Sequence, residues 1–204
     1  ETYYYYTRLL QRAGTNISEY LEFADSFYQT CLDPENASTL AAYLEPDETQ
    51  TNSTYENLNI HSSFERITWG TLDMKLEKKA VPVIEDMNET TCSIYLTYVL
   101  SDTPEDETTD YYNVTDFYRM RYAQSRVMLL DFDRNTQELY DGKHTELTSK
   151  GIDLGVVAKD VQYQSNKSSD IVAFVQEGEL WSYNRSANKT TQIFSFRDGD
   201  LDER

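Results

Sequence analysis

Two hydrophobic periods divide this sequence, and the point where one replaces the other limits the folds open to it. Polar N-cap candidates at residues 15–18 are followed by apolar residues at helical spacing. This stripe consists of Tyr20, Phe23, Ala24, Phe27, Tyr28 and Cys31. Asp33 and Pro34 end it, because the residue before a proline avoids helical angles. We therefore predict a helix that buries the stripe.

Shorter helices are predicted on both sides of this one. Residues 3–13 form a helical pattern that Gly14 ends, and Leu40 and Leu44 support a second short helix over 37–44.

Alternation with period two takes over at about residue 64. We predict strands over 64–78, 92–100 and 112–122, and Pro82 favours an edge strand or a bulge between the first two. In the clearest strand, Cys92, Ile94, Leu96, Tyr98 and Leu100 share one face, and Ser93, Tyr95, Thr97 and Val99 share the other. The order of helices and strands predicts an α+β fold, with N-terminal helices packed on a curved antiparallel sheet and β-hairpins following it. Residues 1–120 resemble an NTF2-like or related cone, by fold analogy alone.

The remaining residues, 121–204, are predicted to form a separate region of β-hairpins. Residues 127–134 lead through a turn to 136–142, and a weak repeat of this pattern pairs 180–185 with 191–196. The stretch IVAFVQEGELWSYNRSANKTTQIFSF, residues 171–196, resembles a blade of TolB-like and prolyl-oligopeptidase-type β-propellers. With the preceding hairpin it also resembles uncharacterised, membrane-anchored extracytoplasmic proteins of Gram-positive gut bacteria. A propeller needs about four blades, so either the chain is part of something longer or the hairpins form a small sheet.

The charge balance excludes several partners. The net charge is −18, from 36 acidic and 18 basic residues, which repels nucleic acid and anionic membrane surfaces. A cationic partner or a divalent ion suits this charge better, unless it serves solubility alone. No apolar run reaches the roughly 20 residues of a membrane span. We expect an extracellular or cell-surface protein, anchored in a membrane only through an N-terminal segment absent from this chain, since Tyr3–Tyr6 suit a position just after such an anchor.

Asparagine is concentrated in Asn-x-Ser/Thr tripeptides. Eight of the 11 asparagines lie in such tripeptides: Asn16, Asn36, Asn52, Asn88, Asn113, Asn166, Asn184 and Asn188. In a eukaryotic secreted protein these would be glycosylation sites, whereas in a bacterium they would be polar turns. Both interpretations predict surface positions.

Reactive groups are few. Cys31 and Cys92 could form one disulfide in an oxidising compartment, but both also suit apolar faces as buried free thiols. The two histidines, His61 and His144, lie in polar stretches typical of the surface. Asp131-x-Asp133-x-Asn135 begins like an EF-hand loop, yet Thr136 and Gly142 replace the glycine and glutamate that such a loop needs. We therefore predict no catalytic residue, metal site or cofactor.

These observations favour a non-catalytic module that binds an extracellular protein or peptide, or that serves a structural role in a surface-anchored protein. The alternative is a small-ligand or glycan site in the open end of the cone, lined by Tyr20, Trp69 and Tyr95. An enzyme with an unrecognised acidic site would instead need buried carboxylates that converge in a cleft.

Overall fold

The structure is a computed structural model of the chain. It describes residues 14–47, 54–103, 109–142, 146–148, 151–153, 161–176 and 178–195, the short strands over 146–148 and 151–153 by their backbone alone. The chain divides into two compact units, unit 1 over Glu1–Gln137 and unit 2 over Glu138–Arg204. The sequence placed the division between residues 120 and 121, within a strand that belongs to the sheet of unit 1.

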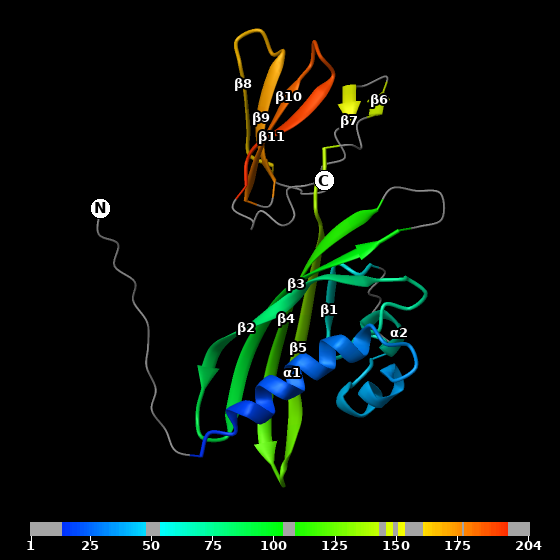
Figure 1. Cartoon of the computed structure of the whole chain (residues 1–204), viewed down its shortest axis with the longest axis vertical. Helices are drawn as coiled ribbons and strands as arrows, with labels where there is room; N and C mark the ends of the chain where they lie inside the picture. Colours follow the sequence, from blue (N-terminus) through cyan, green and yellow to red (C-terminus); the bar gives the residue numbers. More distant parts are fainter. Residues whose placement is uncertain are drawn as a thin grey trace, which may run out of the picture. The chain divides into compact units, whose positions relative to one another are not determined.

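Unit 1 contains one five-stranded sheet. Its elements are α1 (Ile17–Cys31), the 3₁₀ helix η1 (Ala37–Tyr43), β1 (Asn57–Asn59), α2 (Phe64–Ile67), β2 (Lys75–Met87), β3 (Thr91–Asp102), β4 (Asp110–Ala123) and β5 (Arg126–Glu138). The strand order is β1-β5-β4-β3-β2, and α1 crosses one face of the sheet (Figure 1).

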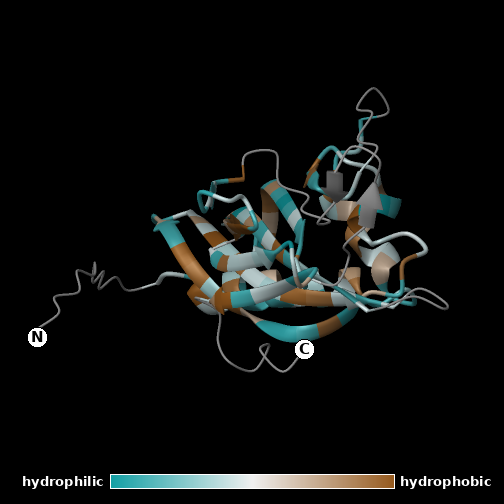
Figure 2. Ribbon diagram, turned by 90° about the horizontal axis from the view of Figure 1, so that it is seen from above, coloured by the Kyte–Doolittle hydropathy of each residue, from teal (hydrophilic) through white to brown (hydrophobic). Residues whose placement is uncertain are grey.

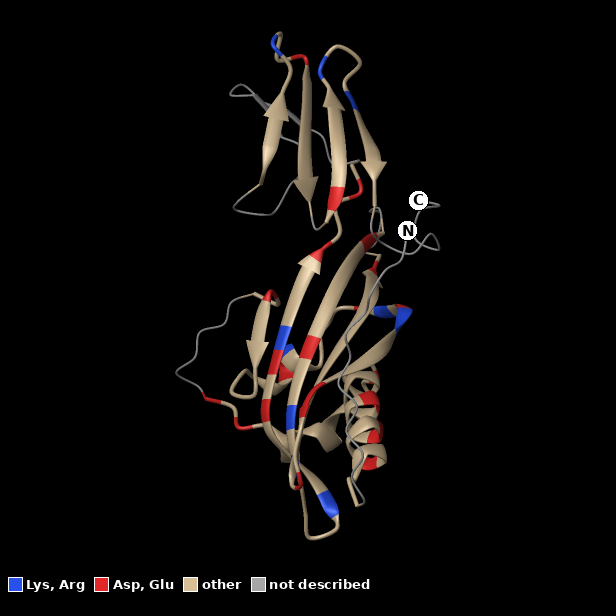
Figure 3. Ribbon diagram, turned by 90° about the vertical axis from the view of Figure 1, so that its left-hand side faces the viewer, with Lys and Arg blue, Asp and Glu red and all other residues tan. Residues whose placement is uncertain are grey.

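The helix predicted from the apolar stripe is confirmed as α1. Five of its six stripe residues are buried, and Phe23 is partly buried. They share one core with inward side chains of β3 and β4, including Ile94, Leu96 and Val114. The exposed side of α1 carries Glu19, Glu22 and Asp25, and these acidic positions follow the helix in Figure 3. The helical spacing of the apolar residues therefore matches the face of α1 that is buried.

The two clearest strand predictions are also confirmed, as β3 and β4. Buried and less buried side chains alternate over residues 94–98 of β3 and 114–121 of β4. Figure 2 shows bands of hydrophobic and hydrophilic residues along the strands of this sheet. Pro82 lies in β2, which is an edge strand whose pairing with β3 is irregular at three points. Proline and broken register both protect an edge strand against pairing with other chains.

The predicted α+β fold is wrong. The protein is mostly β, with 50% strand, 17% helix and only three short helices in the described part. A single helix of 15 residues, rather than a layer of N-terminal helices, crosses the sheet of unit 1. The second short helix is confirmed only as the 3₁₀ helix η1, and the first, over 3–13, lies outside the described residues.

The strand predicted over 64–78 is wrong in its first half. Residues Phe64–Ile67 form α2, and β2 begins only at Lys75. Phe64 and Ile67 are three residues apart, which places both on one side of a helical turn. Trp69 and Gly70 then adopt positive φ angles of 65° and 59°, so the chain cannot continue as a strand.

The hairpin predicted over 127–142 is wrong as well. Residues Arg126–Glu138 form one strand, β5, through the predicted turn. Asn57 pairs with Asn135, and the Thr136 amide donates to the Glu56 carbonyl at 2.8 Å. A partner strand about 80 residues away in sequence therefore replaces the local turn.

Unit 2 contains a four-stranded antiparallel sheet and a short hairpin. The sheet has the order β11-β10-β9-β8, and its strands are β8 (Tyr163–Ser165), β9 (Ile171–Gln176), β10 (Glu179–Asn184) and β11 (Lys189–Phe194). The separate hairpin pairs β6 (Glu146–Thr148) with β7 (Gly151–Asp153). The predicted hairpin over 180–196 is confirmed by β10 and β11. Among the described residues of unit 2, the buried core consists of Tyr140, Phe174, Trp181 and Tyr183.

Candidate functional site

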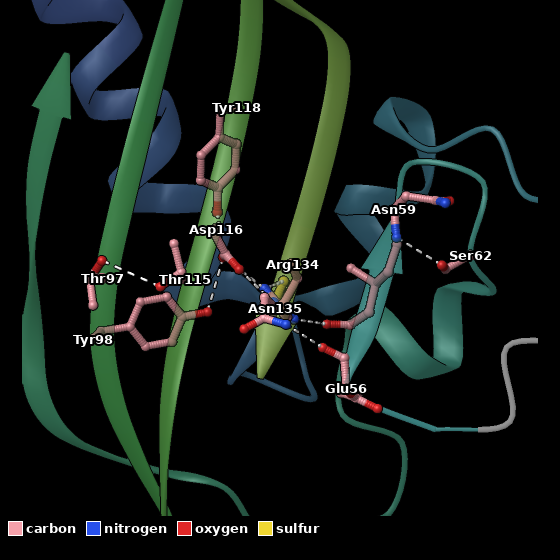
Figure 4. Close-up of polar contacts among 12 residues, drawn as sticks. Glu56, Asn59, Ser62, Thr97, Tyr98, Thr115, Asp116, Tyr118, Arg134 and Asn135 are labelled. Carbon is pink, nitrogen blue, oxygen red and sulfur yellow. Dashed lines mark hydrogen bonds and ion pairs between the residues drawn. The ribbon is translucent and has the colours of Figure 1, made fainter. Parts of the chain in front are cut away.

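The most unusual feature of unit 1 is a buried ion pair between neighbouring strands. Arg134 of β5 donates from Nε to Asp116 Oδ1 at 2.7 Å and from Nη2 to Asp116 Oδ2 at 3.0 Å. Both side chains are completely buried. The hydroxyls of Tyr98 and Tyr118 donate to the same carboxylate at 3.0 and 2.8 Å (Figure 4). Asp116 is therefore bound by three side chains.

Arg134 also connects the sheet to the helices. Its Nη1 donates to the Ile67 carbonyl at 2.7 Å, and Nη2 lies 3.7 Å from the Cys31 sulfur. Its guanidinium lies 4.8 Å from the ring centre of Trp69. Burial alone would lower the pKa of Arg134, but the carboxylate of Asp116 raises it well above its usual value.

The other members of this cluster are held in their neutral forms. Burial raises the pKa of both Tyr98 and Tyr118 well above the usual value, and it raises the pKa of Cys31 to about 11. A thiol with a raised pKa is a poor nucleophile, and the carboxylate of Asp116 already accepts four hydrogen bonds from three side chains. The cluster fixes the positions of α1, α2, β3, β4 and β5 and offers no free reactive group.

A pocket of about 370 Å³ lies beside this cluster. Its walls come from the end of α1, the start of η1 and the segment from α2 to β2, and they include Cys31, Ala37, Phe64, Trp69, Leu72 and Met74. Trp69 holds its positive φ within this wall, and a Cβ on Gly70 would lie 2.8 Å from the Tyr55 hydroxyl. The Trp69 Nε1 is buried and has no hydrogen-bond acceptor.

The three residues predicted to line a ligand site are not brought together. Tyr20 is 2% exposed and its hydroxyl joins two strand ends, donating to the Thr90 carbonyl and accepting from the Tyr122 amide. Trp69 is also 2% exposed and stacks on Tyr55, so it presents no free ring face to a sugar. Tyr95 lies on the opposite face of the sheet.

That opposite face carries an exposed apolar row across three strands. Val83 of β2 pairs with Tyr95 of β3, which pairs with Phe117 of β4. We call these residues the outer row. Val83 is 59% and Tyr95 37% exposed, and the rings of Tyr95 and Phe117 lie 5.0 Å apart. Three more apolar side chains of β2 and β5 are exposed: Val81, Met128 and Leu130.

Sequence reasoning did not identify this surface as a site. The signal was present in β3, where Tyr95 alternates with the core residues and therefore had to face away from them. What the sequence lacked was the register that aligns Tyr95 with Val83 and Phe117.

The cysteines are buried, whereas the asparagines of the Asn-x-Ser/Thr tripeptides are exposed or partly buried where the structure describes them. Cys31 and Cys92 are both buried and free. Burial raises the pKa of the Cys92 thiol, like that of Cys31, to about 11. Of the eight asparagines, Asn36, Asn88, Asn166 and Asn188 are exposed, Asn16, Asn113 and Asn184 are partly buried, and Asn52 lies outside the described residues.

Several of these asparagines organise turns. The Asn88 side chain accepts from the amides of Thr90 and Thr91 between β2 and β3. Asn166 accepts from the amides of Asp170 and Ile171 between β8 and β9. The tripeptides therefore serve local turn chemistry at these positions, as asparagine side chains commonly do.

The other candidate groups form no site. The His61 amide donates to Asn59 Oδ1 at 2.9 Å, and its ring Nδ1 lies 2.9 Å from the Glu45 carbonyl oxygen. His144 lies outside the described residues. Asp131, Asp133 and Asn135 lie along β5 rather than in a loop. Within the described residues, no group of three His, Cys, Asp or Glu side chains could hold a metal, and no helix is long and apolar enough to cross a membrane.

Comparison of the chain with protein-family models, curated protein sequences and solved structures gives no match.

Proposed function

We propose that this chain is a non-catalytic, extracytoplasmic interaction module that binds another protein through the outer row of unit 1. The observation that carries the proposal is the alignment of Val83, Tyr95 and Phe117 on an exposed sheet face. Exposed apolar side chains that form a continuous patch mark interaction surfaces more often than scattered ones do.

The composition of this face also supports protein binding. Aromatic residues, methionine and arginine are enriched in interfaces, and the face carries Tyr95, Phe117, Met128, Arg119 and Arg121. The closed hydrogen bonding of Asp116 and Arg134 supports a non-catalytic role, because their polar atoms already have partners. The acidic composition and the eight Asn-x-Ser/Thr tripeptides support the extracytoplasmic location.

The test is selection of peptide ligands from a displayed random library on the full chain. The Tyr95→Ser variant should lose at least about tenfold in affinity for the selected peptides, as an aromatic hot spot does. Tyr163→Ser is the matched control, since Tyr163 is an exposed tyrosine of unit 2, at 71%. Equal affinity of wild type and Tyr95→Ser for every selected peptide would refute the proposal.

A second candidate is a small-ligand site in the pocket beside Trp69. The buried Nε1 without an acceptor favours it, together with a volume at the lower end of the usual range for ligand sites. Trp69 emission should shift when a small apolar molecule with a hydrogen-bond acceptor is titrated into a Trp181→Phe variant. An unchanged emission across a fragment library would argue against it.

A further inference from the structure

Two arginines stand next to the outer row on the same sheet face. On β4, Phe117, Arg119 and Arg121 occupy alternate positions and therefore share the face opposite the core. Arg119 pairs across the sheet with Ser93, and Arg121 pairs with Thr91. Both arginines are exposed. From Phe117, the β4 member of the outer row, the two guanidinium groups therefore follow along β4 toward the β4–β5 turn.

These guanidinium groups have no carboxylate partner among the described residues. The chain has twice as many acidic as basic residues, so intramolecular partners are plentiful. Arg134 is paired with Asp116, and Lys75 lies 3.4 Å from Asp73. Unlike Arg134 and Lys75, Arg119 and Arg121 form no ion pair within the described residues. Their planar guanidinium groups can therefore bind a carboxylate of another molecule.

Acidic residues on the same face lie at other points. Asp86 pairs with Ser93, which places it two strands from Arg119, a separation of about 10 Å at normal strand spacing. Asp133 of β5 is exposed and pairs with Asn59 of β1, at the other edge of the sheet. The acidic residues of this face therefore lie away from β4, and its positive charge is concentrated at Arg119 and Arg121.

Two charge effects act on a partner at this surface. The net charge of −18 repels an acidic molecule at long range, but that repulsion is screened beyond about 8 Å at physiological ionic strength. Contact with Arg119 and Arg121 acts at a few ångströms and decides the docked state. A second copy of the chain would bring the same arginines and the same net charge, which opposes self-association.

We propose that the partner is a protein segment whose apolar side chains cover Val83, Tyr95 and Phe117, and whose Asp or Glu residues pair with Arg119 and Arg121. This inference rests on the proposed function and adds the chemistry of the partner.

The test repeats the library selection on the full-length wild type, on Arg119→Glu/Arg121→Glu and on a control, Lys167→Glu/Arg185→Glu. The control reverses two exposed basic residues of unit 2 and changes the net charge equally. Peptides selected on the wild type should combine apolar residues with Asp or Glu. They should lose about tenfold in affinity on Arg119→Glu/Arg121→Glu, which should select Lys or Arg instead, and they should bind the control unchanged.

The outcomes separate the two proposals. Loss of binding in Tyr95→Ser without loss in Arg119→Glu/Arg121→Glu would overturn the acidic partner and leave the proposed function standing. Loss in neither variant would overturn both. A dimer of the wild type in solution that Tyr95→Ser dissociates would identify a second copy as the occupant and overturn the acidic partner. Circular dichroism confirms that each variant is folded.

Discussion

The two units bury a carboxylate in different ways. In unit 1, Asp116 is completely buried and is paired with Arg134 and two tyrosine hydroxyls. In unit 2, Glu179 is 7% exposed and accepts from the Trp181 Nε1 at 3.3 Å and the Ser195 hydroxyl at 3.0 Å. Complete burial of a carboxylate is costly without a counter-ion, and Arg134 supplies one to Asp116, whereas Glu179 keeps some contact with solvent.

The size of the two cores explains this difference. Within the part of the chain that the structure describes, the buried core of unit 1 includes residues from α1, η1, α2 and four of its five strands. The corresponding core of unit 2 consists of four aromatic side chains. Each unit has one buried tryptophan, Trp69 in unit 1 and Trp181 in unit 2. Trp181→Phe and Trp69→Phe variants therefore allow the unfolding of each unit to be followed by fluorescence on its own.

The largest expected effect comes from breaking the ion pair. Arg134→Met leaves Asp116 buried without its counter-ion and should lower the free energy of unfolding of unit 1 by about 3–5 kcal/mol. Urea denaturation followed by Trp69 emission measures it. Adding Asp116→Leu to Arg134→Met should restore much of the loss, because the unpaired charge is then gone. If Arg134→Met alone were as stable as the wild type, the ion pair would not stabilise unit 1.

A pH titration sharpens the comparison further. Burial raises the pKa of Cys31 to about 11, so the thiol ionises more readily in the unfolded chain than in the folded one. Stability from this group is complete below the unfolded pKa and declines between about pH 9 and pH 11, by about 2–3 kcal/mol. The buried tyrosines act in the same direction, and the difference between wild type and Cys31→Ala isolates the thiol. Parallel curves for the two proteins would exclude this contribution.

In unit 2, two glycines test how tightly its small core is packed. Gly142 and Gly178 have φ angles of 74° and 79°, so alanine is strained at both. A Cβ at Gly142 would lie 3.0 Å from the Trp181 ring, whereas nothing lies within 4 Å at Gly178. Gly178→Ala should cost about 1 kcal/mol, and Gly142→Ala about 1 kcal/mol more. Thermal unfolding followed by Trp181 emission measures both losses. Equal losses for Gly142→Ala and Gly178→Ala would mean that the Trp181 side chain moves aside at little energetic cost.

The smallest effect is expected where a side chain joins α1 to the sheet. Tyr20→Phe removes the hydroxyl that bridges the Thr90 carbonyl and the Tyr122 amide, at 2.9 Å each. The loss should be about 1 kcal/mol in unit 1, with no change in unit 2. Urea denaturation of unit 1 measures this loss, and an unchanged midpoint would show that water replaces the hydroxyl.

Local patterns predicted the elements whose burial follows their own period. The stripe from Tyr20 to Cys31 specified α1, and alternation specified β3 and β4, because each pattern places all its apolar residues on one side. Pro82 marked the edge strand, because proline lacks the amide that a central strand needs. The Asn-x-Ser/Thr tripeptides indicated surface positions, and those described are at least partly exposed.

By itself, then, the sequence determined that α1 is helical, that β3 and β4 are extended, and which face of these three elements is apolar. The tertiary structure decided that Arg134 would be buried with Asp116, that residues 133–136 would pair with β1 instead of turning, and that Tyr95 would align with Val83 and Phe117. The physical reason is that a period is a property of consecutive residues. The partner of a charge, the neighbour of a strand and the register of a sheet depend on residues brought close only by folding.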